Sequence, residues 1–155
     1  MTVAGPGFVD QFDLAVLSIQ AGDFAAALAN LDRARSVCTD ELDAARCDDL
    51  AGAVLRRLGR TDEALERLST AANAFSTLGD ARLAAASIES RAGVLLDLGD
   101  TEAAVIDLRY AFDVHQQFGH DLSAEATAQR LTGLLITLGR DDEAQAVAAS
   151  VGRNH

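Results

Sequence analysis

The stretch LGRTDEAL at residues 58–65 decides the fold, because related stretches recur along the chain. LGDTEAAV follows at residues 98–105 and LGRDDEAQ at residues 138–145, each 40 residues after the one before. AGDFAAAL at residues 21–28 is an earlier copy at a slightly shorter spacing. Self-similarity at a fixed period of this length is typical of repeat architectures. The sequence therefore predicts four copies of one structural unit.

A second signal divides each copy in half. Leu78-Gly79 and Phe118-Gly119 fall midway between the main glycines of the repeat. A glycine just past a helix end adopts the left-handed conformation without the steric cost of a Cβ atom, and the apolar residue before it packs the last turn. Each copy is therefore predicted to be a pair of helices. The short connections make neighbouring helices antiparallel.

The apolar residues between these glycines follow a helical spacing, and no stretch alternates like a β-strand. The predicted helices span residues 8–21, 23–38, 40–58, 61–78, 80–98, 101–118, 121–138 and 141–150. We expect Thr61 and Thr101, together with Asp80 or Asp100, to cap helix N-termini. Helices at close approach leave room only for small side chains, and these are predicted to be Ala27, Ala64, Ala104 and Ala144.

The domain organisation predicted from this pattern is simple. Residues 1–7 form a flexible head, and residues 8–151 form a single domain with repeats at about 8–38, 40–78, 80–118 and 121–150. Pro6 is the only proline, so no proline-rich linker interrupts the repeats.

The charge balance restricts the class of partner. The chain has 13 basic and 24 acidic residues, a formal charge of −11. Such a charge repels phosphate groups, which argues against binding to nucleic acid or to an anionic membrane and favours a basic or neutral protein partner. No apolar run approaches the roughly 20 residues of a membrane span, and no secretion signal is evident, so we expect a cytoplasmic protein.

These residues resemble the tetratricopeptide repeat (TPR) family, in its longer-period subclass of about 40 residues that includes kinesin light chains. The resemblance rests on the glycine that ends the first helix and on the pairs Glu63-Ala64, Ala103-Ala104 and Glu143-Ala144, with Gly52 and Ala71 at further family positions. It implies an all-α solenoid of four antiparallel helix hairpins with right-handed curvature. In the family, the first helices of successive repeats line a concave groove that binds a peptide.

The resemblance therefore implies a protein- or peptide-binding adaptor or scaffold, with no enzymatic activity and no cofactor. The residues expected to line the groove are Val9, Phe12, Val16, Ile19, Arg46, Asp49, Ala53, Arg56, Glu89, Gly93, Gln129, Arg130 and Gly133. Ala53, Gly93 and Gly133 occupy equivalent positions and would leave room for a ligand. An amphipathic helix is the natural ligand for such a groove.

Alternatives remain open for both parts of this surface. Arg57 is expected on the groove side of the same helix as Arg46 and Arg56. All three arginines also fit a solvated helix face, with i,i+3 or i,i+4 pairs such as Arg46 with Asp49. The apolar stripe from Val9 to Ile19 also fits a homodimer interface, because an uncapped terminal repeat exposes apolar surface. Val147 and Val151 suggest a second uncapped end. The alternative function is a self-associating regulatory or assembly module of a bacterial signalling system.

His115 is the residue that most suggests a metal or catalytic site. The repeat places it where Phe75 and Cys38 stand in the earlier copies, which indicates an imidazole at the edge of the core. A metal site with His120 and Asp121 is disfavoured, because the two histidines are five residues apart across a helix end rather than four apart on one helix face. No catalytic or metal-binding residue is predicted.

The two cysteines are interpreted as small core residues. Cys47 aligns with Ser87 and Thr127, which are small residues at a packed crossing, and Cys38 falls in an apolar stripe. Two cysteines at this spacing match neither a disulfide scaffold nor a paired-thiol metal site.

Overall fold

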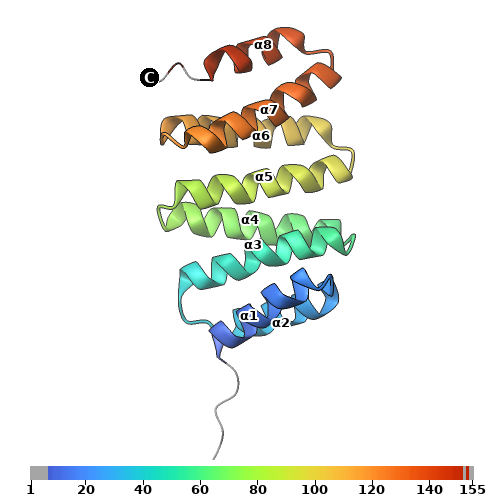
Figure 1. The fold of residues 1–155 in the computed structure, drawn as a ribbon, viewed down its shortest axis with the longest axis vertical. Helices are drawn as coiled ribbons and strands as arrows, with labels where there is room; N and C mark the ends of the chain where they lie inside the picture. The colour runs from blue at the N-terminus through green and yellow to red at the C-terminus, as the bar shows by residue number, and fades with distance from the viewer. Residues whose placement is uncertain (1–6, 152, 154–155) are drawn as a thin grey trace, which may run out of the picture. The chain divides into compact units, whose positions relative to one another are not determined.

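The computed structural model describes residues 7–151 and Arg153. This part of the chain contains helices and no strand (Figure 1). The helices are α1 (Phe8–Gln20), α2 (Phe24–Val37), α3 (Glu41–Arg57), α4 (Thr61–Thr77), α5 (Ala81–Asp97), α6 (Thr101–Gln117), α7 (Asp121–Thr137) and α8 (Asp141–Ser150). All eight were predicted from the sequence, and each observed end lies within one residue of the predicted one. Of the predicted flexible head, residues 1–6 lie outside the described part.

The glycines end the helices as the repeat predicts. Gly22, Gly59, Gly79, Gly99, Gly119 and Gly139 all have positive φ, between 69° and 80°. At Gly59, the amide of the next residue, Arg60, donates to the carbonyl oxygen of Leu55 at 2.9 Å, and the glycine amide donates to that of Arg56 at 3.0 Å. These two bonds form a Schellman motif, which satisfies carbonyl groups that the helix end leaves without partners.

The predicted N-caps are correct for aspartate and wrong for threonine. The carboxylates of Asp80 and Asp100 accept hydrogen bonds from backbone amides three residues on, at 3.0 and 3.2 Å. Thr61 and Thr101 are instead the first helical residues. A capping side chain must lie one residue outside the helix to reach these amides, so the prediction for threonine was displaced by one position.

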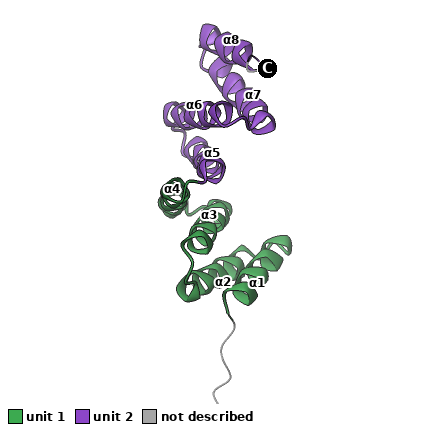
Figure 2. Ribbon diagram, turned by 90° about the vertical axis from the view of Figure 1, so that its left-hand side faces the viewer, with its two compact units in different colours: residues 1–79 green, residues 80–155 purple. Residues whose placement is uncertain are grey.

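The described chain divides into two compact units, residues 1–79 and residues 80–155 (Figure 2). Unit 1 contains the hairpins α1/α2 and α3/α4, and unit 2 contains α5/α6 and α7/α8. Within each unit, every helix packs against the helix that follows it in the chain. The single domain spanning residues 8–151 stays a prediction, and each unit is described by itself below.

Small residues fill the helix crossings. Ala27, Ala64, Ala104 and Ala144 are all at most 2% exposed, as predicted. Gly52 is buried in α3, and a Cβ atom added there would lie 2.4 Å from Cγ of Leu68 in α4. The backbones of these two helices therefore approach as closely as a glycine allows.

Each unit also contains a buried carboxylate held by arginine. In unit 1, Asp48 of α3 accepts from Arg35 of α2 at 3.2 Å and from Arg67 of α4 at 2.7 Å. In unit 2, Asp107 of α6 accepts two hydrogen bonds from Arg91 of α5, at 2.7 and 2.8 Å. The side chains of Asp48 and Asp107 are 6% and 8% exposed. A carboxylate buried this deeply requires such partners.

Candidate partner-binding surface

The predicted apolar stripe of α1 is divided by the structure into two parts. Phe12, Val16 and Ile19 are half-buried, whereas Val9 is 65% exposed. The ring of Phe12 lies under the guanidinium of Arg46 in α3, with 5.2 Å between the guanidinium carbon and the ring centroid. Phe12 and Arg46, both predicted site residues, therefore meet between the first helices of the two hairpins of unit 1.

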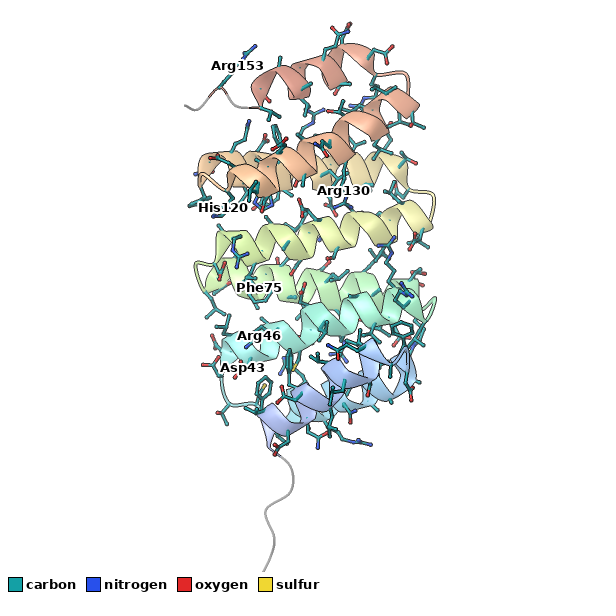
Figure 3. All side chains as sticks on the ribbon, in the orientation of Figure 1. Asp43, Arg46, Phe75, His120, Arg130 and Arg153 are labelled. Atoms are coloured by element: carbon teal, nitrogen blue, oxygen red, sulfur yellow. The ribbon has the colours of Figure 1, made fainter. Side chains whose placement is uncertain are left out.

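Arg46 forms an i,i+3 pair within α3, as expected for this helix. Its guanidinium lies 3.3 Å from the carboxylate of Asp43, and Figure 3 labels both side chains. The sequence named Asp49 as an example of such a partner; Asp43 is a partner that precedes Arg46 in the chain, and Asp49 also interacts with another group. An arginine that stacks on a ring and pairs with a carboxylate is held in one orientation.

An apolar hollow of about 290 Å³ lies further along the same surface of unit 1. It is lined by Ile19, Phe24, Leu50, Ala53, Val54 and Arg57. Arg57 lies over the ring of Phe24, with its guanidinium carbon 4.9 Å from the ring centroid. The hollow therefore has apolar walls and a cation at its edge, and a second arginine-on-phenylalanine contact forms part of it.

The sequence identified part of this hollow. Ile19, Ala53 and Arg57 were predicted, while Phe24 was not. The signal for Phe24 was present, because the equivalent positions of the later repeats have Thr61, Thr101 and Asp141 in place of an aromatic residue. Because the other copies fold with a polar residue at this position, an aromatic ring there is not required by the repeat fold. It indicates a surface feature specific to the first repeat.

The remaining predicted residues of unit 1 lie on the same helix as Ala53. Asp49 is half-buried and Arg56 is exposed, and both interact with other groups. Ala53 is exposed, so the room that the sequence predicted at this position is present. Together these residues give α3 a mixed surface of charge and small apolar side chains.

The five predicted residues of unit 2 separate into inner and outer positions. Glu89 of α5 accepts a hydrogen bond from the hydroxyl of Thr127 in α7, and its carboxylate lies 3.4 Å from Nε2 of His115. Gly93 is buried, whereas Gln129, Arg130 and Gly133 on α7 are exposed (Figure 3 labels Arg130). Their part in partner binding stays a prediction.

His115 is a buried residue, as its place in the repeat predicts. It is 1% exposed, and burial lowers the pKa of its imidazole below the ordinary value. Its Nδ1 lies 3.3 Å from Nδ1 of His120, whose ring stacks on that of Phe118. Within the described residues, no group of three or more side chains is placed to bind a metal ion.

The two cysteines differ in burial. Cys47 is completely buried, and desolvation raises the pKa of its thiol to about 11, so it is a core residue as predicted. Cys38 is half-buried and lies just past the end of α2, where its thiol donates to the carbonyl oxygen of Arg35 at 3.2 Å. The core assignment of Cys38 was wrong because α2 ends before this residue.

At the other end of the chain, the apolar surface predicted around Val147 and Val151 is largely covered. Val147 is 4% exposed and Val151 is half-buried. The large exposed apolar side chains of this hairpin are those of Leu122 and Ile136 on α7. None of the described helices is long and apolar enough to cross a membrane.

Solved structures resemble this chain across almost its whole length. BtubC (BKLC) from P. vanneervenii superposes with a TM-score of 0.83 over 94% of this chain, at 15% sequence identity. "Podosopora anserina putative kinesin light chain nearly identical TPR-like repeats" superposes with a TM-score of 0.76 over 93% of this chain, at 18% identity. The chain has a TPR-like fold.

The predicted fold class, an all-α solenoid of TPR-like hairpins, is thereby confirmed. The TPR-like chain spans 62% of the length of the BtubC chain and 72% of the putative kinesin light chain structure. No family model and no curated protein matches its sequence. At these identities the likeness concerns the fold, and the TPR-like fold commonly mediates interactions between proteins.

Proposed function

We propose that this chain is an adaptor or scaffold module that binds a segment of another protein along the first-helix surface of unit 1. The observation that carries the proposal is the apolar hollow beside Ala53, with Arg57 over Phe24 at its edge. A hollow of about 290 Å³ accommodates one apolar side chain of a partner and is close to the lower limit of ordinary ligand pockets.

The surface around the hollow favours an amphipathic ligand. Arg46 and Arg57 offer guanidinium groups, while Asp43 and Asp49 offer carboxylates on the same helix. An amphipathic helix can place an apolar anchor in the hollow while its polar side chains meet these charges. The predicted residues of unit 2 are not needed for this anchor.

A library of displayed peptides, selected on the wild-type chain, tests the proposal. Ala53→Arg fills the mouth of the hollow, and Ala29→Arg makes the same change at an exposed position of α2 in the same unit. We expect selected peptides to bind the Ala29→Arg control as they bind wild type and to lose at least tenfold in affinity for Ala53→Arg, about 1.4 kcal/mol. Peptides that bind both variants equally would place recognition elsewhere.

Self-association is the second candidate function, and the exposed side of α1 favours it. Val9, Leu14 and Leu17 are 65%, 47% and 59% exposed on this helix. Asp10 and Asp13 lie among them, and α1 contains no basic residue. A symmetric contact between two copies of this face would bring four carboxylates together, which weakens it at neutral pH.

Solution mass separates the two candidates. Light scattering over a wide concentration range is measured for wild type, for Leu17→Glu on α1, and for Ile106→Glu, a control at an exposed apolar position of α6. The adaptor proposal expects a concentration-independent monomer for all three. A dimer that Leu17→Glu dissociates and Ile106→Glu leaves intact would instead support the assembly module.

A further inference from the structure

A second hollow, of about 450 Å³, lies in unit 1 at the end of α2. Its walls are the last turn of α2 with the loop to α3, the first half of α3 and the second half of α4. It shares no lining residue with the hollow beside Ala53. It is therefore a separate feature of the same unit.

The hollow coincides with a break in the repeat. Ala27 of α2 and Ala64 of α4 occupy the same place, and counting on from them aligns Cys38 with Phe75. In α4, Phe75 is helical and 1% exposed. In the shorter α2, of 14 residues against 17, the chain leaves the helix at Cys38, which is extended at φ −73° and ψ 143°. The first hairpin thus lacks both an aromatic side chain and the last helical turn that carries it.

The third copy supports the same reading of this position. His115 stands there in α6, and its ring is also 1% exposed. Two of the equivalent positions are therefore filled by a buried ring, and the one at Cys38 has a small side chain at the wall of a cavity. The repeat itself indicates the shape of the missing group, which is a planar ring.

The chemistry of the walls suits a ring with a basic neighbour. Ala45, Ala74 and Leu78 provide apolar surface. The half-exposed Arg35, held by its pair with Asp48 at the wall of the hollow, presents its guanidinium to a ring as Arg46 and Arg57 do elsewhere in this unit. Acidic side chains at the rim belong to the loop and the start of α3. These are Asp40 and Glu41, both exposed.

We propose that this hollow binds an aromatic side chain of a partner protein, presented next to a basic residue. The ring takes the place that Phe75 and His115 take in the later copies, and the basic residue meets Asp40 and Glu41. The volume lies within the 300 to 1,000 Å³ of ordinary ligand pockets. The site would be a second contact for a partner, independent of the hollow beside Ala53.

A tryptophan peptide tests the proposal directly, because the chain contains no tryptophan and indole fluorescence therefore reports the probe alone. The probe is acetyl-Arg-Trp-Arg-amide, and acetyl-Arg-Ala-Arg-amide is its matched competitor. We expect a saturable change in indole emission with a dissociation constant below about 1 mM, and no displacement by the alanine peptide at equal concentration. An emission change that rises linearly up to 1 mM, or equal displacement by the alanine peptide, overturns the proposal.

Two variants fill the hollow from its α4 wall. Ala74→Phe and Asn73→Phe place a ring at lining positions, the second of them exposed to solvent, and circular dichroism checks that each remains folded. We expect each folded variant to reduce the affinity for the probe at least tenfold. Glu41→Gln should reduce it several-fold and weaken its dependence on salt. A folded filling variant that binds the probe like wild type contradicts the inference.

The variant Ala53→Arg keeps this test separate from the proposed function. We expect Ala53→Arg to bind the tryptophan probe as wild type does, because Ala53 does not line this hollow. Loss of probe binding in Ala53→Arg, with binding retained in Ala74→Phe, would assign the probe to the first-helix surface and overturn the inference.

Discussion

The two units contain the same kind of helix hairpins but place their buried charges in opposite ways. Arg67 in α4 and Asp107 in α6 are 40 residues apart and occupy the same place in the repeat. In unit 1 this place holds the arginine, and the carboxylate comes from Asp48 of α3. In unit 2 it holds the carboxylate, and the arginine comes from Arg91 of α5.

The difference shows what the hairpin requires at this crossing. Both units satisfy a buried carboxylate by pairing it with an arginine of a neighbouring helix, while the sign of the charge is reversed at the shared position of Arg67 and Asp107. In unit 1 the network extends to α2, because Arg35 donates to Asp48 and Arg67 also pairs with Asp32. The ion-pair network of unit 1 therefore joins the three helices α2, α3 and α4, whereas the pair of Arg91 and Asp107 in unit 2 joins α5 and α6.

A second difference concerns the closest contact between paired helices. Gly52 lies against Leu68 in unit 1, and the equivalent residues of unit 2 are Ala92 and Leu108, which are 0% and 1% exposed. Unit 1 excludes a methyl group at a place where unit 2 buries one. The same sequence pattern therefore allows two spacings of the helix pair.

The largest expected effect comes from removing the buried carboxylates. Asp48→Ala leaves Arg35 and Arg67 close together without their shared partner, and we expect a loss of about 2 to 3 kcal/mol in the free energy of unfolding. Asp107→Ala should cost less, because a single arginine loses this carboxylate. Urea denaturation measures both, and hydrogen exchange assigns the loss to a unit. If both substitutions reduced the free energy of unfolding equally, the additional arginine in the network of unit 1 would contribute no stability beyond that of the single pair in unit 2.

An intermediate effect, opposite in sign between the units, is expected at two helical glycines. Gly52→Ala brings a Cβ atom against Leu68 and should cost about 1 to 3 kcal/mol. Gly133→Ala in α7 places the new Cβ more than 4 Å from every atom outside the adjacent backbone of its own helix, and should stabilise the chain by about 0.5 to 1 kcal/mol through helix propensity. If both substitutions moved the urea midpoint in the same direction, the claim that α3 and α4 approach too closely at Gly52 for a Cβ atom would be contradicted.

The smallest effect is a pH dependence specific to unit 2. Burial lowers the pKa of His115, with the positive charges of His120 and Arg82 acting in the same direction and the carboxylate of Glu89 opposing it. The unfolded chain, with an ordinary histidine pKa of 6.5, therefore binds the proton first as the pH falls. Stability from this group is complete above about pH 7.5 and decreases below pH 6.5 until the native pKa is reached.

His115→Phe, which copies the residue at the equivalent position of unit 1, should remove this dependence. We expect a flatter plot of melting temperature against pH between 5 and 8 for the variant than for wild type. Carboxylate protonation at lower pH affects both proteins alike and serves as the internal reference. Parallel plots across this range would show that His115 does not titrate differently in the folded state.

The sequence alone determined the helices, the positions of their glycine stops and the small residues at their crossings. These features depend on local chemistry that repeats along the chain: helical periodicity, the freedom of glycine at positive φ, and side-chain volume. Gly59, Gly99 and Ala104 could therefore be assigned from spacing alone. The TPR-like fold was implied by the resemblance of this pattern to a known family.

The candidate site was only half determined in this way. Ile19, Ala53 and Arg57 were found because they fall on first helices, but Phe24 of α2 meets Arg57 only where α2 begins beside α3. Glu89 was assigned to the groove, whereas its carboxylate meets Thr127 and His115. Periodicity gives the face of a helix on which a residue lies and does not give the distance to side chains on other helices.

The tertiary structure alone decided which charges pair and where the surface is hollow. Asp48 with Arg67, and Asp107 with Arg91, join residues 19 and 16 positions apart, and no local rule selects the sign at each place. The hollow at Cys38 exists where α2 ends early, beside the first half of α3 and the second half of α4. Its presence depends on packing between helices, which the sequence of any one helix does not contain.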